Sequence, residues 1–197
     1  MSKGSLFIIS GPSGTGKGTV CAELLKEDNI FLSISATTRN MRAGEAEGVT
    51  YYYISNEKFE EMINSEQMLE YAINGGNYYG TPKKAVCDML DSGKNVILEI
   101  EPQGALKVKK QMPEAVLIFI LPPSIAELRK RLSGRGREES DEIEQRIDAA
   151  KWEFSKAHEY NYVIINDDLE KCVNEALDII KSTNEKRMLI DKLLKEI

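Results

Sequence analysis

The chain of 197 residues lacks the long apolar runs that mark membrane proteins. Its longest such run, residues 115–121, is far shorter than the roughly 20 apolar residues that a membrane-spanning helix requires. The first residues show no charged segment followed by an apolar stretch, so the sequence does not predict a signal peptide. We therefore expect a cytoplasmic protein with no membrane partner.

Cysteine and histidine are scarce as well. The cysteines Cys21, Cys87 and Cys172 are far apart, and their spacing matches no metal site. We expect them to be small buried side chains in a reducing compartment. The only histidine, His158, is interpreted as a surface or helix-end residue with no catalytic role.

The chain has no excess of positive charge either. It carries 26 Lys and Arg against 32 Asp and Glu, a formal net charge of −6. Non-specific binding to nucleic acid requires a basic surface, so we expect no nucleic-acid partner. A protein of this charge that binds anionic substrates has to gather its cations locally. The length fits one domain with a full core and small inserted lobes.

What the chain does contain is a regular alternation of strand-like and helix-like segments. Apolar strand-like runs, most of them continuously apolar, predict strands at 6–10, 32–36, 95–100, 115–121 and 162–165. Helical patterns predict helices at about 17–28, 82–92, 103–111, 124–133, 139–159 and 169–181. Strands that are apolar throughout are typical of a parallel sheet covered on both faces. The sequence therefore predicts an α/β three-layer fold with a central parallel sheet.

Three segments fall outside this alternation. Residues 37–81 are rich in Tyr, Gly, Asn and charge, and predict a small lobe inserted between core segments 1–36 and 82–197. In residues 133–138, glycines flank Arg135 on both sides, which is typical of a mobile cationic lid. The tail beyond residue 184 is amphipathic and predicts a helix packed on the core or on a partner subunit.

The most informative segment follows the first apolar run and reads Gly11, Pro12, Ser13, Gly14, Thr15, Gly16, Lys17. Backbone N–H groups wrap a polyphosphate only where glycines let the chain bend tightly. The helix that follows directs its positive end at the same anion, and Lys17 adds a full charge. The segment therefore predicts a nucleotide-binding phosphate loop. Gly18 replaces the usual Ser or Thr, so the nearest hydroxyl for magnesium is that of Thr19.

Two arginines three residues apart, Arg39 and Arg42, follow the second predicted strand. Taken alone, such a pair is typical of a solvated face. Guanidinium groups bind phosphate in a bidentate manner, however, and this pair lies at a strand end in the same fold as a phosphate loop. That position favours a receptor for a phosphate monoester.

At these residues the chain resembles the guanylate kinase family, over about residues 5–180. The resemblance rests on the phosphate loop, Thr37-Thr38-Arg39-x-x-Arg42-x-Gly44-Glu45, Gly48-x-x-Tyr51, Gly76-Asn77-Tyr78-Tyr79-Gly80-Thr81, Leu98-Glu99-Ile100-x-x-Gln103-Gly104, Gly134-Arg135-Gly136 and Asn166-Asp167-Asp168-Leu169-Glu170. It implies transfer of the γ-phosphoryl group from ATP to GMP, with residues 37–81 as the GMP-binding lobe. It also implies Mg²⁺ held mainly by phosphate oxygens and water, with Thr19 or Glu101 as the candidate protein ligand.

The resemblance further implies roles for individual residues. The implied ATP-binding residues are the loop from Gly11 to Lys17 with Gly18, Thr19, Arg131, Asn166 and Asp167. The implied GMP-binding residues are Ser35, Arg39, Arg42, Tyr51 and Tyr79 for the phosphate, Glu70 and Thr81 for the base, and Glu45, Glu99 and Glu101. The implied catalytic cations are Lys17, Arg42, Arg135 and Arg146.

Two positions depart from the family pattern. Glu101 stands where the family usually has Asp, and its extra methylene shifts any contact to guanine or metal-bound water. Arg137 stands where the family often has Thr. Strand alternation places Glu99 and Glu101 on the same side, and which of them faces the site stays open.

Two alternatives remain at this stage. One is a kinase for another nucleoside monophosphate, and Glu70 and Thr81 are the residues that discriminate. The other is a non-catalytic guanylate-kinase-like module that binds proteins. Such modules typically have a degraded phosphate loop, whereas this chain keeps Gly16, Lys17 and the arginines. The pattern leaves open whether the protein is a monomer or a homodimer.

Overall fold

The computed structural model describes residues 3–133 and 140–194. Within them, five strands form a core sheet in the order β2-β7-β1-β8-β9, and every pairing is parallel. These strands are β1 (Leu6–Ser10), β2 (Ile30–Leu32), β7 (Asn95–Glu99), β8 (Val116–Leu121) and β9 (Tyr162–Ile165). The central parallel sheet predicted from the apolar runs is thus confirmed.

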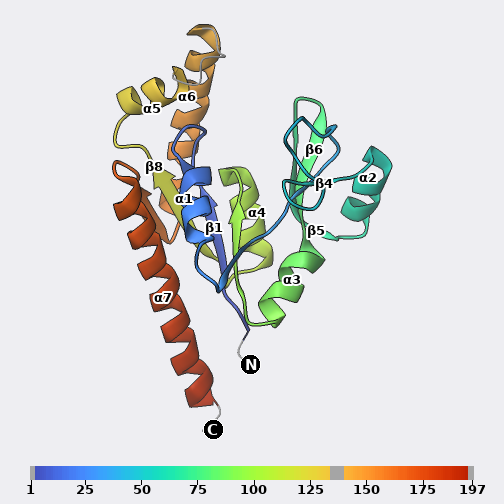
Figure 1. Cartoon of the computed structure of the whole chain (residues 1–197), viewed down its shortest axis with the longest axis vertical. Coiled ribbons are helices and arrows are strands. Elements are labelled where there is room, and N and C mark those ends of the chain that lie inside the picture. Colours follow the sequence, from blue (N-terminus) through green and yellow to red (C-terminus); the bar gives the residue numbers. More distant parts are fainter. Residues whose placement is uncertain (1–2, 134–139, 195–197) are drawn as a thin grey trace.

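Helices cover both faces of the core sheet (Figure 1). Phe7 and Ile9 of β1 pack with buried residues of α1 and α7 on one face. Leu6 and Ile8 pack with residues of α3 and α4 on the other. Successive side chains of a strand point to opposite faces, so β1 contributes to both halves of the core. The helices are α1 (Lys17–Leu24), α2 (Asn56–Asn64), α3 (Lys83–Asp91), α4 (Pro102–Gln111), α5 (Ile125–Ser133), α6 (Ser140–Phe154) and α7 (Leu169–Leu194), with a short 3₁₀ helix at Ala157–Glu159.

A second sheet lies to one side of the core, between residues 36 and 82 (Figure 1). Its strand order is β4-β3-β6-β5, and β6 pairs antiparallel with both of its neighbours. The strands are β3 (Ala36–Thr37), β4 (Tyr52–Tyr53), β5 (Met68–Asn74) and β6 (Asn77–Pro82). Helix α2, capped at its start by Ser55, packs on this sheet through Phe59, which stacks on Tyr78 with ring centroids 5.0 Å apart. The lobe thus has a small core of its own.

Helices α5 and α6 form a third packed unit, at the end of the sheet where the phosphate loop lies (Figure 1). Leu128 and Leu132 of α5 are buried against Ile147 and Ala150 of α6. An ion pair between Arg129 and Glu144 joins the two helices on the outside. Arg135 and Arg137 of the predicted lid, together with the rest of residues 134–139, lie outside the described residues.

The structure corrects the predicted strand at 32–36. The chain leaves the core sheet after Leu32 and joins the second sheet at Ala36, so this run is divided between two sheets. Between them the Ser33 N–H still donates to the Ile97 carbonyl, at 2.9 Å. Leu32 is half-buried and Ala36 is buried, so apolar residues recur across the transition and sequence alone did not separate the two strands.

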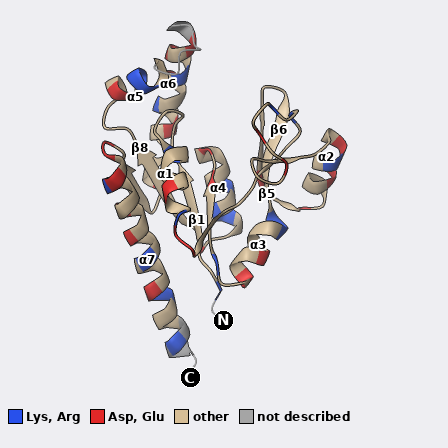
Figure 2. Cartoon of the chain, in the orientation of Figure 1, with Lys and Arg blue, Asp and Glu red and all other residues tan. Residues whose placement is uncertain are grey.

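The last helix is also longer than predicted. Instead of ending near residue 181, α7 continues as one helix of 26 residues to Leu194. The hydroxyl of Thr183 donates to the Ile179 carbonyl at 2.8 Å, so the polar residues there stay within the helix. Acidic and basic residues are interspersed along α7 (Figure 2). In the described part of the chain, no helix combines the length and apolar character needed to cross a bilayer.

Replacing Phe7 with Ala tests the central position of β1. Phe7 is fully buried, and the truncation leaves a cavity at the centre of the sheet. We expect the free energy of unfolding to fall by about 3–5 kcal/mol, measured by urea denaturation with circular dichroism. The control Val49→Ala, at a position that is 73% exposed, should stay within about 0.5 kcal/mol of the original chain. Equal effects of the two substitutions would contradict this placement of the core.

Candidate functional site

The loop between β1 and α1 has the backbone that its glycines predict. Gly11, Gly14 and Gly16 adopt positive φ angles of 139°, 85° and 91°, which side chains other than that of glycine rarely tolerate. A Cβ atom at Gly11 would also lie 2.4 Å from the Ile120 carbonyl oxygen. The loop therefore curls tightly against the end of β8 and leads directly into the first turn of α1.

Lys17 is the first residue of α1. Its ammonium donates to the carbonyls of Gly11, at 2.5 Å, and of Pro12, at 2.9 Å. Burial lowers the pKa of this ammonium, and the negative charges of Glu99 and Glu153 partly oppose that effect. The result is a cation held across the mouth of a loop of backbone N–H groups, which is the chemistry of a polyphosphate receptor.

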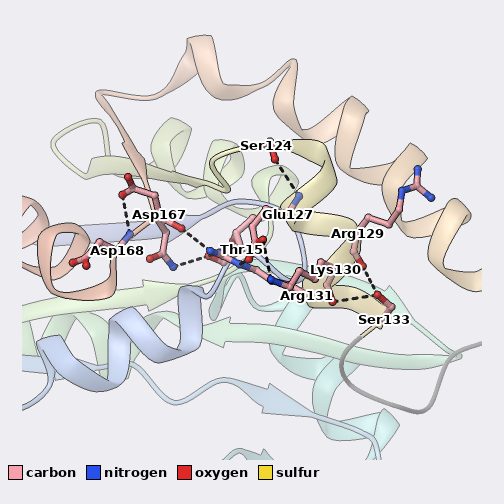
Figure 3. A network of polar contacts seen from close by, with 10 residues as sticks. Thr15, Ser124, Glu127, Arg129, Lys130, Arg131, Ser133, Asp167 and Asp168 are labelled. Carbon is pink, nitrogen blue, oxygen red and sulfur yellow. Dashed lines mark hydrogen bonds and ion pairs between the residues drawn. The ribbon is translucent and has the colours of Figure 1, made fainter.

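A polar network ties this loop to α5 and to the end of β9 (Figure 3). The Thr15 carbonyl accepts from Asn166 Nδ2 at 2.8 Å and from Arg131 at 3.4 Å. Arg131 also donates to the Asn166 carbonyl at 2.9 Å and to Glu127 at 3.0 Å. Asp167, the next residue, accepts from the Asp168 N–H at 2.8 Å. Two predicted ATP-binding residues from outside the loop, Arg131 and Asn166, thus come together at its Thr15 carbonyl.

Helix α6 reaches the loop from the other side. Arg146 donates to the Ser13 hydroxyl at 2.9 Å. Glu153, seven residues further along, lies on the same helical face, and its Oε2 atom is buried without a hydrogen bond from the described residues. Burial raises the pKa of Glu153, and the positive charge of Lys17 opposes the rise. Sequence analysis missed this carboxylate, and its spacing from Arg146 is the only signal that marks it.

A second cluster lies in the smaller lobe, around Arg39. Its guanidinium forms a bidentate ion pair with Glu45, at 2.8 and 3.0 Å, and the two side chains are only 12% and 19% exposed. The guanidinium also lies over the rings of Tyr51 and Tyr53, 5.6 and 5.9 Å from their centroids. The Tyr53 hydroxyl donates to Glu45 at 2.8 Å. Tyr53 is a member of this cluster that sequence analysis did not identify.

The remaining predicted phosphate ligands surround this cluster. Tyr79 contacts Tyr51 edge to face, with ring centroids 5.9 Å apart. Arg42 is exposed, and its backbone N–H donates to Glu45 at 2.8 Å. Ser35 lies just before β3, where its carbonyl accepts from the Tyr52 N–H. The cluster gathers guanidinium, phenol and hydroxyl groups, all of which bind phosphate.

Glu70 and Thr81 form a buried pair on neighbouring strands of the same lobe. Thr81 donates its hydroxyl proton to Glu70 Oε1 at 2.8 Å, and Glu70 is only 8% exposed. Burial raises the pKa of Glu70, while the Thr81 hydrogen bond acts in the opposite direction. A buried carboxylate with one hydrogen-bond partner retains lone pairs for further N–H donors.

Glu99 lies between the two clusters, at the end of β7. A Cβ atom built on Gly18 would lie 3.6 Å from its carboxylate, so it borders the start of α1. Burial lowers the pKa of Lys17 in one cluster and raises the pKa of Tyr51 in the other, and the negative charge of Glu99 opposes the first shift and adds to the second. Desolvation raises the pKa of Glu99 itself, and Lys17 opposes that rise. Glu101 is the N-cap residue of α4 and is exposed.

This edge of the sheet offers ligands of the type that Mg²⁺ prefers. Thr19 and the carboxylates of Glu99 and Glu101 supply oxygen atoms, and hard divalent cations bind oxygen. The described residues contain no group of three or more His, Cys, Asp or Glu that would hold a metal alone. The donor set therefore fits an ion that takes most of its ligands from phosphates and water.

Comparison with known proteins identifies relatives over nearly the whole chain. The family model described as guanylate kinase matches residues 3–183. The guanylate kinase of Clostridium acetobutylicum is 53% identical over 90% of this chain and 85% of that protein. That of Clostridioides difficile is 49% identical over 99% and 98%. The crystal structure of guanylate kinase from Anaplasma phagocytophilum superposes with a TM-score of 0.74, at 36% identity over 92% of this chain and 86% of that one.

The Arg39–Glu45 pair predicts a specific acid sensitivity. The guanidinium of Arg39 and the backbone N–H of Arg42 lower the pKa of Glu45 from its usual 4.5 to about 2. A carboxyl with a lowered pKa in the folded state stabilises the protein above pH 4.5, and this stabilisation is lost as pH falls toward 2. We expect the original chain to exceed Glu45→Gln in free energy of unfolding at about pH 5, and this margin to shrink by about pH 3. Urea denaturation at both pH values measures this difference in free energy of unfolding. An equal difference at about pH 5 and about pH 3 would refute the stabilising role of the Glu45 carboxylate.

Proposed function

The chain belongs to the guanylate kinase family, and we propose that its phosphate loop binds ATP while the cluster around Arg39 binds the phosphate of GMP. Its activity is that of an ATP:GMP phosphotransferase, which transfers the γ-phosphoryl group of ATP to GMP and yields ADP and GDP. The observation that carries the residue assignments is the buried Glu70–Thr81 pair, in the same lobe as the Arg39 cluster. The Glu70–Thr81 pair offers hydrogen-bond acceptors for the guanine base, and the Arg39 cluster offers cations and donors for the GMP phosphate.

On the donor side, the loop N–H groups and Lys17 hold the ATP phosphates. Lys17 exchanges its carbonyl partners for phosphate oxygens, which as anions are the stronger acceptors. Arg131 and Asn166 shape the loop through the Thr15 carbonyl, and Asp167 lies beside them at the expected place of the adenine. Gly18 leaves the α1 terminus without a side chain next to the phosphates.

On the acceptor side, Arg39, Arg42, Tyr51 and Tyr79 bind the GMP phosphate, with Ser35 at their edge. Glu45 orients Arg39 rather than meeting the anion, because a carboxylate repels phosphate and its oxygens already accept from Arg39. The tyrosine rings shelter the guanidinium from water, which strengthens its interaction with the incoming charge. We assign the lobe formed by residues 37–81 as the GMP-binding part of the molecule.

Glu70 reads the base. Guanine presents its N1–H and its N2 amino group side by side, and one carboxylate accepts from both. Adenine has no such pair of donors, so a lone pair of its N1 atom would face the carboxylate. Rejection of a base that leaves a buried acceptor unpaired reaches roughly 10⁴–10⁵-fold in sites of this kind. The Thr81 hydroxyl holds the carboxylate in place for this contact.

The transfer itself requires positioning and neutralisation of charge. The migrating phosphoryl group is metaphosphate-like, so the cations Lys17, Arg42 and Arg146 lower the barrier without covalent chemistry. The GMP phosphate is already an anionic nucleophile, and no general base is needed. Water competes as acceptor, so closure of the lobe and of the proposed lid at 133–138, with Arg135, precedes transfer.

Mg²⁺ is the proposed cofactor, with Thr19 or Glu101 as its candidate protein ligand. When bound, it neutralises part of the charge on the ATP phosphates. Glu101 carries one more methylene than the Asp that the family usually has, so its carboxylate reaches further from α4. The rest of the binding falls to the chain: the loop N–H groups and Lys17 orient the phosphates, and Arg146 approaches them from α6.

A panel of acceptors tests the proposed function. With ATP and Mg²⁺, release of ADP is measured in a coupled assay with GMP, AMP, UMP or CMP as acceptor. We expect rapid turnover with GMP and rejection of AMP by roughly 10⁴-fold in kcat/KM. Preferred turnover of another monophosphate would refute the role of Glu70. A folded protein that binds ATP but has no activity with any acceptor would instead be a non-catalytic module.

Replacing Glu70 with Gln tests the base reader directly. The amide offers one acceptor in place of two, and its NH₂ group opposes one guanine donor. We expect kcat/KM for GMP to fall about 100-fold, mostly through KM, and the preference for GMP over AMP to narrow. The control Glu66→Gln alters an exposed carboxyl in the same segment and should behave as the original chain. An unchanged preference for GMP in Glu70→Gln would exclude Glu70 as the reader.

A further inference from the structure

Gly104 is an unusual residue for its place in α4. It lies in the first turn of this helix, two residues after Pro102, and is buried. Its φ angle is not among the positive values, so its backbone conformation is one that any residue adopts. Glycine weakens a helix relative to alanine because it loses more conformational freedom on folding. The position therefore calls for a reason other than backbone geometry.

The reason is the carboxylate of Glu70. A Cβ atom built on Gly104 would lie 2.8 Å from Glu70 Oε2, 3.2 Å from its Cδ and 3.4 Å from its Cγ. Non-bonded carbon atoms pack at about 3.5–4.0 Å, so even a methyl group would displace the carboxylate. The opposite side of the carboxylate is held as well, because Thr81 donates to Oε1 at 2.8 Å. The Glu70 carboxylate thus lies between Thr81 of the neighbouring strand and the backbone of α4 at Gly104.

Two hydrogen bonds hold α4 against β5. Gln111 of α4 donates to the Leu69 carbonyl at 2.8 Å, and Lys107 donates to the Tyr71 carbonyl at 3.0 Å. These two carbonyls flank Glu70 along β5. Gly104, Lys107 and Gln111 are spaced three and four residues apart, so they share one face of α4. Because the two hydrogen bonds hold α4 close to β5, any side chain at position 104 would have to displace the Glu70 carboxylate.

We propose that Gly104 is a positioning residue for guanine recognition: the missing side chain lets α4 hold the Glu70 carboxylate in the orientation that accepts two base N–H groups. The proposal rests on the proposed function, which assigns the base to Glu70. It goes beyond that assignment because it makes α4 of the core, and not the smaller lobe alone, responsible for selectivity. Docking of α4 on β5 then sets the geometry of the reader.

Gly104→Ala is the direct test, with GMP and IMP as acceptors. IMP lacks the N2 amino group, so the ratio of kcat/KM for GMP to that for IMP reports how well the carboxylate meets both donors. We expect this ratio to fall about tenfold, through a higher KM for GMP and with kcat nearly unchanged. The control Lys110→Ala lies on the exposed side of α4 and should leave the ratio unchanged.

A second substitution separates positioning from simple packing. Glu70→Asp withdraws the carboxylate by one methylene, which makes room for the methyl group that Gly104→Ala introduces. In the original chain, Glu70→Asp should lower the ratio of kcat/KM for GMP to that for IMP. In the Gly104→Ala variant, the same substitution should lower this ratio little further. If Gly104→Ala folds poorly, the double variant should recover stability in urea denaturation. The proposal would be overturned if the two substitutions lowered the GMP to IMP ratio independently of one another. It would also be overturned if Gly104→Ala lost stability and the double variant did not regain it.

The outcomes also distinguish this proposal from the one on which it rests. If Glu70→Gln changes base preference but Gly104→Ala leaves the GMP to IMP ratio intact, Gly104 has no positioning role and the assignment of Glu70 stands. If neither substitution changes the preference for GMP, the base reader itself is wrong and the role of Gly104 falls with it.

Discussion

The parallel direction of the core strands is the constraint on which the site depends. Because β1, β7 and β9 run the same way, their carboxyl ends meet at one edge, where the phosphate loop, Glu99 and Asn166 follow directly. The register pairs Ile9 with Glu99, so the carboxylate lies beside the strand end from which the loop departs. β1 is buried on both faces, so a slip of one residue would exchange the side chains that pack in the two halves of the core and disrupt both. The geometry of the candidate site is therefore set by buried apolar residues that take no part in the reaction.

Around this edge the protein balances its charges in pairs. Lys17 is countered by Glu99 and Glu153, and Arg39 by Glu45, within a chain that is acidic overall. Burying an unpaired charge is costly, so each cation has a carboxylate near it before any phosphate arrives. Arg39 and Lys17 are held by their surroundings in different ways. Glu45 holds Arg39 through direct hydrogen bonds. In the described part of the chain, the Lys17 ammonium donates to the carbonyls of Gly11 and Pro12, and it is left able to turn toward an anion.

The sequence predicts the parts of this arrangement that are encoded locally. The phosphate loop is recognisable because its glycines and lysine act within a few residues, and β1 and β9 match the apolar runs that predict them. Contacts between distant segments escaped prediction: the approach of Gly104 to Glu70, the position of Glu153 near Lys17, and the addition of Tyr53 to the Arg39 cluster. The division of residues 32–36 escaped too, because burial in two different sheets leaves the same apolar pattern.

The pairing of β1 also constrains the order in which the molecule folds. This strand is synthesised before both of its neighbours, which lie far along the chain, in strands that begin at Asn95 and Val116. Its amino end is joined late as well, since Ser5 and Gly4 bond to Asn184 and Arg187 of the last helix. Contacts of such long sequence separation form slowly. The loop between β1 and α1 is therefore synthesised before the strands that support it and is among the last segments to acquire its shape.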